Sequence, residues 1–193
     1  MPAVFRSCLG VAVLGLLATR LAAGPDTPCS FEVLGGSFVS PLWNRGRRET
    51  FNYTGVFLRE AWPLSWRGRP QAGWDWVGEL FAADVTAGFG HELGGASLLA
   101  RRWLGRPEAR WHPYVQFGFG AACTDAYRDR AQQQLGEALE FKTTVSAGLH
   151  APLSRGWSWV GELSFNHLSD GGLSDRNYGV HALGLAVGLS RPL

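Results

Sequence analysis

The stretch FNHLSDGGLSDRNYG, residues 165–179, carries a histidine and a serine two positions apart, His167 and Ser169. On an extended strand, residues i and i+2 share a face and lie roughly 6.6 Å apart. An imidazole nitrogen can then reach the serine hydroxyl, which is how a general base is placed beside a serine nucleophile. The spacing therefore points to ester or amide chemistry, provided that both residues lie on one strand.

Residues that follow the pair could complete such a site. If the hairpin is centred on Ser174, His181 on the next strand lies opposite His167. The backbone N–H of Gly172 and the side-chain amide of Asn177 could stabilise the negative oxygen that forms when a nucleophile attacks a carbonyl. We therefore expect one polar patch near the ends of two neighbouring strands.

The segment around the pair alternates between two kinds of residue, as a strand with two different faces does. In residues 157–170, the odd positions hold mainly Trp, Leu and Phe, whereas the even positions hold mainly Ser, Glu, Asn and Asp. Residues 110–122, 139–151 and 177–191 alternate in the same way. The histidine and the serine fall on the bulky, apolar face.

On each strand, the face that carries small residues indicates which environment the face with bulky residues meets. A soluble barrel would place its large apolar residues inside. The alternation alone therefore does not tell whether the bulky face points to the lumen or to lipid. Glycine, alanine and hydroxyl residues with a few charges suit the crowded, polar interior of a narrow barrel, however, whereas bulky residues suit lipid. Six tryptophans are expected near strand ends, as in the aromatic belts of membrane proteins: Trp66, Trp74, Trp103, Trp111, Trp157 and Trp159.

The sequence predicts an all-β fold, an eight-stranded antiparallel transmembrane β-barrel of the bacterial outer membrane. The short connections 67–73, 105–109 and 152–156 are expected in the periplasm, and the longer connections 41–51 and 123–138 at the other end of the barrel, called the outer end below. The strands are expected at about 30–40, 52–66, 74–86, 92–104, 110–122, 139–151, 157–170 and 177–191.

The first 24 residues have the pattern of a secretory signal peptide. Arg6 precedes an apolar stretch from Leu9 to Leu17, and small residues around Ala23 and Gly24 mark the expected cleavage site. The apolar stretch is shorter than the roughly 20 residues of a spanning helix. Residues 25–193 are then expected to form a single barrel domain in the cell outer membrane.

Two cysteines remain after the predicted cleavage, Cys29 and Cys123. The strand directions place Cys29 at the periplasmic end and Cys123 at the outer end, about 25 Å apart. A disulfide allows only roughly 4–7 Å between Cα atoms. The two thiols are therefore not expected to form a disulfide with each other.

Several other kinds of function are not supported. The formal net charge of +2 is too small to indicate a nucleic-acid partner. His91 and Glu92 begin like a zinc-protease motif, but Gly95 stands where the second histidine is needed. There is no phosphate-binding loop and no dinucleotide fingerprint, so we expect neither a metal nor a cofactor.

Two stretches resemble the lipid A 3-O-deacylase family (PagL type). One is the run F-x-H-x-S-x-G-G-L at 165–173, followed by Asn177 and Gly179. The other is HPYVQFGFGA at 112–121, which is similar to the family's Pro-Tyr-Val-Glu-x-Gly-x-Gly strand. The resemblance implies an eight-stranded outer-membrane barrel with an outward-facing Ser–His–acid site. It implies hydrolysis of the ester-linked 3-hydroxyacyl chain at position 3 of lipid A.

The resemblance also implies residue roles and a partner. Ser169 would be the nucleophile, His167 the general base, and Gly172 and Asn177 would bind the oxyanion. The partner would be lipid A or lipopolysaccharide in the outer leaflet, reached by a membrane-embedded protein; a homodimer stays open.

Two positions depart from the family pattern. Asp170 follows the serine where the family usually has Asn, and we place it with the oxyanion and substrate-binding residues. His181 stands where the best-known member has the acid of its triad, so we place it with the catalytic residues. A neutral histidine can orient His167 but stabilises an imidazolium less than a carboxylate does. Slower chemistry, a substitute carboxylate such as Asp170 or Asp175, and lost activity stay open; activity is our prediction.

Three functions are therefore weighed. The first is a serine esterase acting on lipid A from within the outer leaflet. The second is a non-enzymatic small barrel for adhesion or membrane integrity, in which the histidine and serine only meet headgroups and water. The third, which the crowded lumen disfavours, is a soluble periplasmic barrel that binds an apolar ligand inside.

Overall fold

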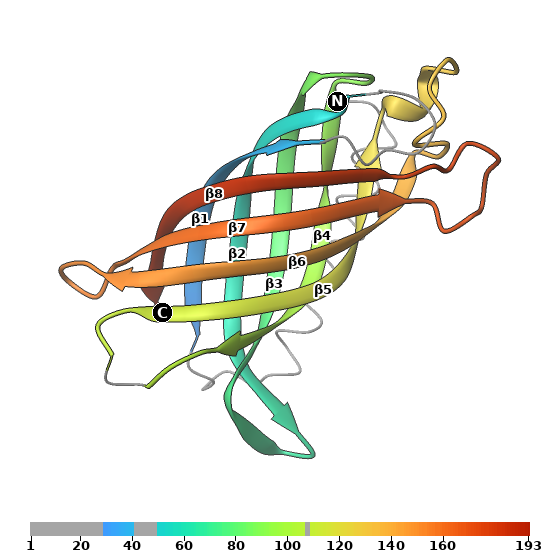
Figure 1. Cartoon of the computed structure of the whole chain (residues 1–193). Coiled ribbons are helices and arrows are strands. Elements are labelled where there is room, and N and C mark those ends of the chain that lie inside the picture. Colours follow the sequence, from blue (N-terminus) through green and yellow to red (C-terminus); the bar gives the residue numbers. More distant parts are fainter. Residues whose placement is uncertain (1–28, 41–49, 107–108) are drawn as a thin grey trace.

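The computed structural model describes residues 29–40, 50–106 and 109–193, which form a closed antiparallel barrel (Figure 1). Each strand pairs with its neighbours in sequence, and β8 closes on β1. A short 3-10 helix, η1 (Ala126–Arg128), lies between β5 and β6. The strands are β1 (Ser30–Val39), β2 (Asn52–Trp66), β3 (Arg69–Ala87), β4 (Glu92–Trp103), β5 (His112–Thr124), β6 (Leu139–Pro152), β7 (Ser158–Ser169) and β8 (Val180–Pro192).

The predicted fold and the number of strands are confirmed, and one connection differs. The periplasmic connection expected at 67–73 is a two-residue turn, because β3 already begins at Arg69. Arg67 and Gly68 have φ angles of 52° and 75°. Two successive residues with positive φ suit the right-handed twist of a tight hairpin. Paired strands therefore continue almost to the turn and project from the barrel at its lower end in Figure 1.

The side chains of β8 show how the two faces differ. Leu183, Leu185, Val187 and Leu189 point outward and are 37–65% exposed. The residues between them are small, and Ala182 and Ala186 are buried in the lumen. A closed barrel with an apolar outer wall satisfies its backbone hydrogen bonds internally and presents hydrocarbon to lipid. The inference that the bulky face points outward is confirmed. Within the described part of the chain, no helix has the length and apolarity to span a membrane.

The middle of the lumen holds three acidic and three basic side chains, all buried: Glu32, Glu79, Glu162, Arg59, Arg101 and Lys142. Arg59 donates to both carboxylate oxygens of Glu162, at 2.8 and 2.9 Å, and to Glu79 at 2.8 Å. Arg101 donates to Glu32 at 2.5 and 2.9 Å. Buried charges are costly unless they are paired and hydrogen-bonded, so this balanced network is what permits a charged lumen.

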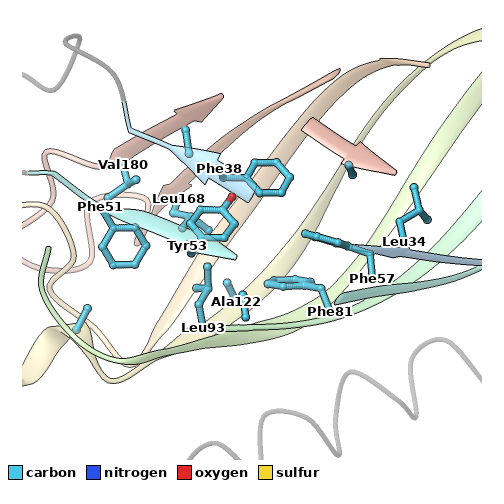
Figure 2. Close-up of a cluster of buried hydrophobic side chains, with 14 of the residues drawn as sticks. Leu34, Phe38, Phe51, Tyr53, Phe57, Phe81, Leu93, Ala122, Leu168 and Val180 are labelled. Atoms are coloured by element: carbon cyan, nitrogen blue, oxygen red, sulfur yellow. The ribbon is translucent and has the colours of Figure 1, made fainter. Parts of the chain in front are cut away.

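The outer part of the lumen is filled by apolar side chains that the sequence did not place there (Figure 2). The rings of Phe38 and Tyr53 stack with centroids 4.8 Å apart. The Phe38 ring fits because the neighbouring strand β8 lacks a side chain here: Gly184 pairs with Phe38, and a Cβ on it would lie only 2.3 Å from the ring. Glycines on one strand therefore create the space that aromatic rings from other strands fill.

Trp103 also lies in the lumen and not in an outer aromatic belt. Its indole N–H donates to Asp75 at 2.6 Å, and its ring meets the ring of the buried His150 edge-on at 5.0 Å. Trp66 and Trp111, by contrast, are 68% and 52% exposed at the periplasmic end. The expectation that Trp103 belongs to an outer aromatic belt was wrong, because its position on β4 falls on the face that points into the lumen.

Cys29 and Cys123 are buried and are not joined to each other by a disulfide. Cys29 directly precedes β1, whereas Cys123 lies near the outer end of β5. The strand directions that separated the two thiols are therefore confirmed. The predicted signal peptide lies outside the described residues.

Candidate active site

His167 and Ser169 lie at the outer end of β7, on the outward side of the barrel wall. Both are partly exposed, whereas the residues between and after them, Leu168 and Asp170, are buried. In the sheet, Ser169 is level with Phe141 of β6. Both side chains therefore lie on the outward face of β7, as the alternation predicted.

His181 lies directly opposite His167 across the β7–β8 pair, as the hairpin reading predicted. The two Nδ1 atoms are 3.2 Å apart, a hydrogen bond in which one ring donates and the other accepts. The rings stack with centroids 4.6 Å apart and an interplanar angle of 22°. The structure therefore joins the two histidines into one unit.

On the loop side, the ring of His167 lies close to Gly179. This glycine has a φ of 73°, and a Cβ on it would lie 2.7 Å from Cε1 of His167. Any other residue here would meet both backbone strain and the imidazole. Gly179 thus lets the chain pass close to the ring.

Ser169 is not hydrogen-bonded to His167: in the part of the chain that the structure describes, its hydroxyl makes no hydrogen bond. The two side chains share the outward face two residues apart, so a change in the serine rotamer brings Oγ toward the imidazole. Catalytic hydrogen bonds are often long or absent without substrate and form in the complex.

Asp170 organises the loop after β7. Its carboxylate is buried and accepts hydrogen bonds from the backbone N–H groups of Gly172, at 2.8 Å, and Leu173, at 3.1 Å, and from the Ser174 hydroxyl. This is an Asx-type turn, in which an Asp side chain replaces backbone partners. Asp170 therefore points to the lumen side, away from the face that carries Ser169.

Both residues expected to bind the oxyanion, Gly172 and Asn177, make hydrogen bonds within this loop. The N–H of Gly172 donates to Asp170. The Oδ1 of Asn177 accepts the backbone N–H of Asp170 at 3.0 Å, which leaves the NH₂ group of Asn177 as its donor toward other partners. Asp175, the other substitute carboxylate, is exposed in the same loop.

Arg176, which sequence reasoning passed over, ties this loop to the one between β5 and β6. Its guanidinium donates to the carbonyls of Asp129 at 2.9 Å, Tyr127 at 3.0 Å and Gly136 at 3.3 Å. The N–H of Gly179 adds a bond to the Gln134 carbonyl at 3.0 Å. Both loops lie at the outer end of the barrel in Figure 1. No local pattern could have shown this, because the contacts join segments 40 to 49 residues apart.

Asp125 connects a third outer loop to this group. Its carboxylate accepts the backbone N–H groups of His91 at 2.7 Å and Glu92 at 3.0 Å. Partial burial raises the pKa of Asp125, but these two donors outweigh it and hold the pKa below its usual range. The ionised carboxylate thus fastens the β3–β4 loop to the start of the β5–β6 loop.

The arrangement can support a nucleophilic serine. When His167 donates its Nδ1 proton to His181, its Nε2 becomes the only ring nitrogen able to accept a proton. A neutral partner histidine can hold this tautomer, as the acid of a serine triad does. Phe141 and Phe165 flank the polar groups on the same wall, so an acyl chain from the bilayer could reach them without leaving an apolar surface.

The chain is similar to known proteins in sequence pattern and in fold. The family model for lipid A 3-O-deacylase (PagL) matches residues 43–190. The solved structure of the outer membrane enzyme PagL aligns with a TM-score of 0.56 and 18% identity, covering 86% of this chain and 99% of that one. The solved structure of Neisserial surface protein A (NspA) aligns with a TM-score of 0.60 and 8% identity, covering 84% of this chain and 96% of that one.

No curated protein matches the chain in sequence. At these identities the two structural likenesses show the fold alone, but the family model spans most of the chain, including both histidines and the serine. The chain belongs to the lipid A 3-O-deacylase (PagL) family and has the closed eight-stranded barrel of the outer-membrane type.

Proposed function

We propose that this protein is a serine esterase that removes the ester-linked 3-hydroxyacyl chain from position 3 of lipid A. Ser169 is the nucleophile, His167 the general base and His181 the residue that orients the base. The observation that carries the proposal is that the serine and both histidines share the lipid-facing wall at the outer end of β7 and β8. Polar groups on such a wall are costly, and such groups tend to be functional.

The proposed reaction has two steps. Ser169 Oγ attacks the ester carbonyl while its proton passes to Nε2 of His167; the bond to the sugar oxygen then breaks, and His167 returns the proton to that oxygen. Water next attacks the acyl-serine, again through His167, and releases a 3-hydroxy fatty acid. The substrate already lies in the outer leaflet, so it needs no extraction from the membrane.

For the oxyanion we propose the NH₂ group of Asn177 and the backbone N–H of Gly172. The Gly172 donor becomes available only when its bond to Asp170 opens, so substrate binding has to rearrange this turn. Asp170 then contributes by shaping the loop. Its carboxylate is engaged by three donors and does not reach His167 from the lumen side.

Mass spectrometry of lipid A tests the proposal. Outer membranes that carry the wild-type protein are expected to contain lipid A that lacks one 3-hydroxyacyl chain. Membranes with the same amount of folded Ser169→Ala protein are expected to keep that chain. Identical spectra for wild type, variant and empty vector would favour the non-enzymatic barrel.

A further inference from the structure

We propose that His167 and His181 form a binding site for a divalent metal ion that favours imidazole, such as Zn²⁺. We further propose that this ion inhibits the enzyme. The binding site depends only on the histidine pair, whereas the inhibition rests on the proposed function of Ser169.

The separation of the two nitrogens is the one that a metal requires. Zinc binds imidazole at about 2.0–2.1 Å, so two nitrogens of a tetrahedral zinc lie roughly 3.3 Å apart. The Nδ1 atoms of His167 and His181 are 3.2 Å apart. Both residues are fixed on directly paired strands, so only rotations of the rings are needed to aim both lone pairs at one ion.

The surroundings leave room for the other ligands. Both imidazoles are partly exposed at the outer end of the wall, close to the aqueous rim. The described residues contain no group of three or more His, Cys, Asp or Glu side chains arranged around a metal. Water or an anionic group of the lipid headgroup would complete the coordination, which suits a reversible site and not a permanent structural one.

Metal binding and catalysis need different tautomers of His167. In the hydrogen-bonded pair, His167 can carry its proton on Nδ1 and leave Nε2 to accept the proton of Ser169. With a metal on both Nδ1 atoms, the proton of each neutral ring resides on Nε2. His167 then has no lone pair for the serine. Binding moves a proton from Nδ1 to Nε2 through solvent and releases none, so the proton count balances.

The site is tested by calorimetric titration of Zn²⁺ into the untagged, folded mature barrel in detergent. Wild type is expected to bind one Zn²⁺ with shifts of the His167 and His181 ring signals in NMR. Loss of a residue that only supports a metal ligand typically lowers the metal affinity by roughly tenfold or more. Loss of one of the two ligands themselves should lower it further. We therefore expect His181→Asn and His167→Asn each to lower the affinity by more than about tenfold.

His112→Asn is the matched control. His112 also faces a histidine across a strand pair, His150, but each of these rings lies edge-on to Trp103. This variant is expected to keep the wild-type affinity. Unchanged Zn²⁺ affinity in both His181→Asn and His167→Asn, with folding verified by circular dichroism, would overturn the proposed site.

The inhibition is measured separately, on ester hydrolysis with and without Zn²⁺. Wild type should lose activity with the same midpoint as its Zn²⁺ titration and regain it with a chelator. Binding without inhibition in an active enzyme would overturn the second half of the proposal. An inactive protein that still binds Zn²⁺ through both histidines would instead count against the proposed esterase, so the two failures are distinguishable.

Discussion

His167 can act as a base only while one ring nitrogen holds a proton and the other is open. His181 supplies the partner for that proton at 3.2 Å, in the position where a triad carries an acid. A carboxylate would in addition stabilise the imidazolium that forms when the serine gives up its proton, and such an acid contributes up to about 10⁴-fold in rate. The histidine pair is therefore expected to orient the base well but to give a lower rate than a triad with a carboxylate would.

His181→Glu is expected to increase the rate of deacylation by about tenfold or more, because it adds the missing charge. His181→Gln is the matched control, since it offers a similar acceptor without charge. The measurement is kcat with lipid A in mixed micelles. A rate for the glutamate variant at or below that of the glutamine variant would show that charge at this position does not limit the reaction.

At the scale of elements, the loop after β7 depends on contacts with the loop before β6. Arg176 binds three carbonyls of the β5–β6 loop, and the N–H groups of Tyr178 and Gly179 bind two more. Because Gly179 lies close to His167, the position of the His167 ring depends on this junction.

Arg176→Ala is expected to speed amide hydrogen exchange at Tyr178 and Gly179 by about tenfold or more, since hydrogen bonds from a charged donor contribute roughly 1.5–3 kcal/mol each. Arg128→Ala, an exposed arginine of η1, serves as the control and should leave both amides protected. Equal exchange in the two variants would mean that the arginine does not hold the loops together.

The Asp125 junction predicts a pH dependence. Its pKa is lower in the folded protein than in the unfolded chain, so its stabilising effect is complete above the usual carboxyl range near pH 4 and is lost as the pH falls through the lowered pKa. Protection factors of the His91 and Glu92 amides should therefore fall with acid. In Asp125→Asn they should not depend on pH over this range; the same acid sensitivity in both proteins would contradict this assignment.

Strand positions and faces could be predicted from the sequence, because alternation in residues such as 157–170 directly reports a strand with two environments. The assumption of a hairpin centred on Ser174 placed His181 opposite His167, and the register confirms it. The junctions of Arg176 and Asp125 could not be predicted, since each joins loops that are distant in sequence. The turn role of Asp170 was also missed, because its side chain faces the lumen and its partners depend on the shape of the loop.

At the scale of the whole molecule, the lumen of the barrel holds two kinds of buried side chains. Three buried acids and three buried bases neutralise one another in the middle, and aromatic rings pack above them toward the outer end. The sequence indicated a polar, crowded lumen but not the aromatic part. From the sequence alone, residues such as Phe38 resemble lipid-facing ones. Only the strand register shows that a glycine pairs with Phe38 and leaves space for its ring.

Arg59→Ala removes the arginine that pairs with both Glu79 and Glu162. Leaving buried carboxylates without their partner is expected to lower the free energy of unfolding by about 3–5 kcal/mol. Denaturant unfolding from lipid vesicles measures this loss. The exposed Arg69 provides the control, and Arg69→Ala should change the stability by less than about 0.5 kcal/mol. Similar losses in the two variants would show that the lumen network does not stabilise the barrel.

The most direct measurement of the central claim is release of 3-hydroxy fatty acid from lipid A in vesicles that contain the purified barrel. Wild-type protein is expected to release the acid until one chain per lipid A has been lost. Ser169→Ala, inserted at the same density and equally stable, is expected to release it more slowly by a factor on the order of 10⁴ or more. Release by Ser169→Ala at the wild-type rate would contradict the assignment of this lipid-facing serine as the nucleophile.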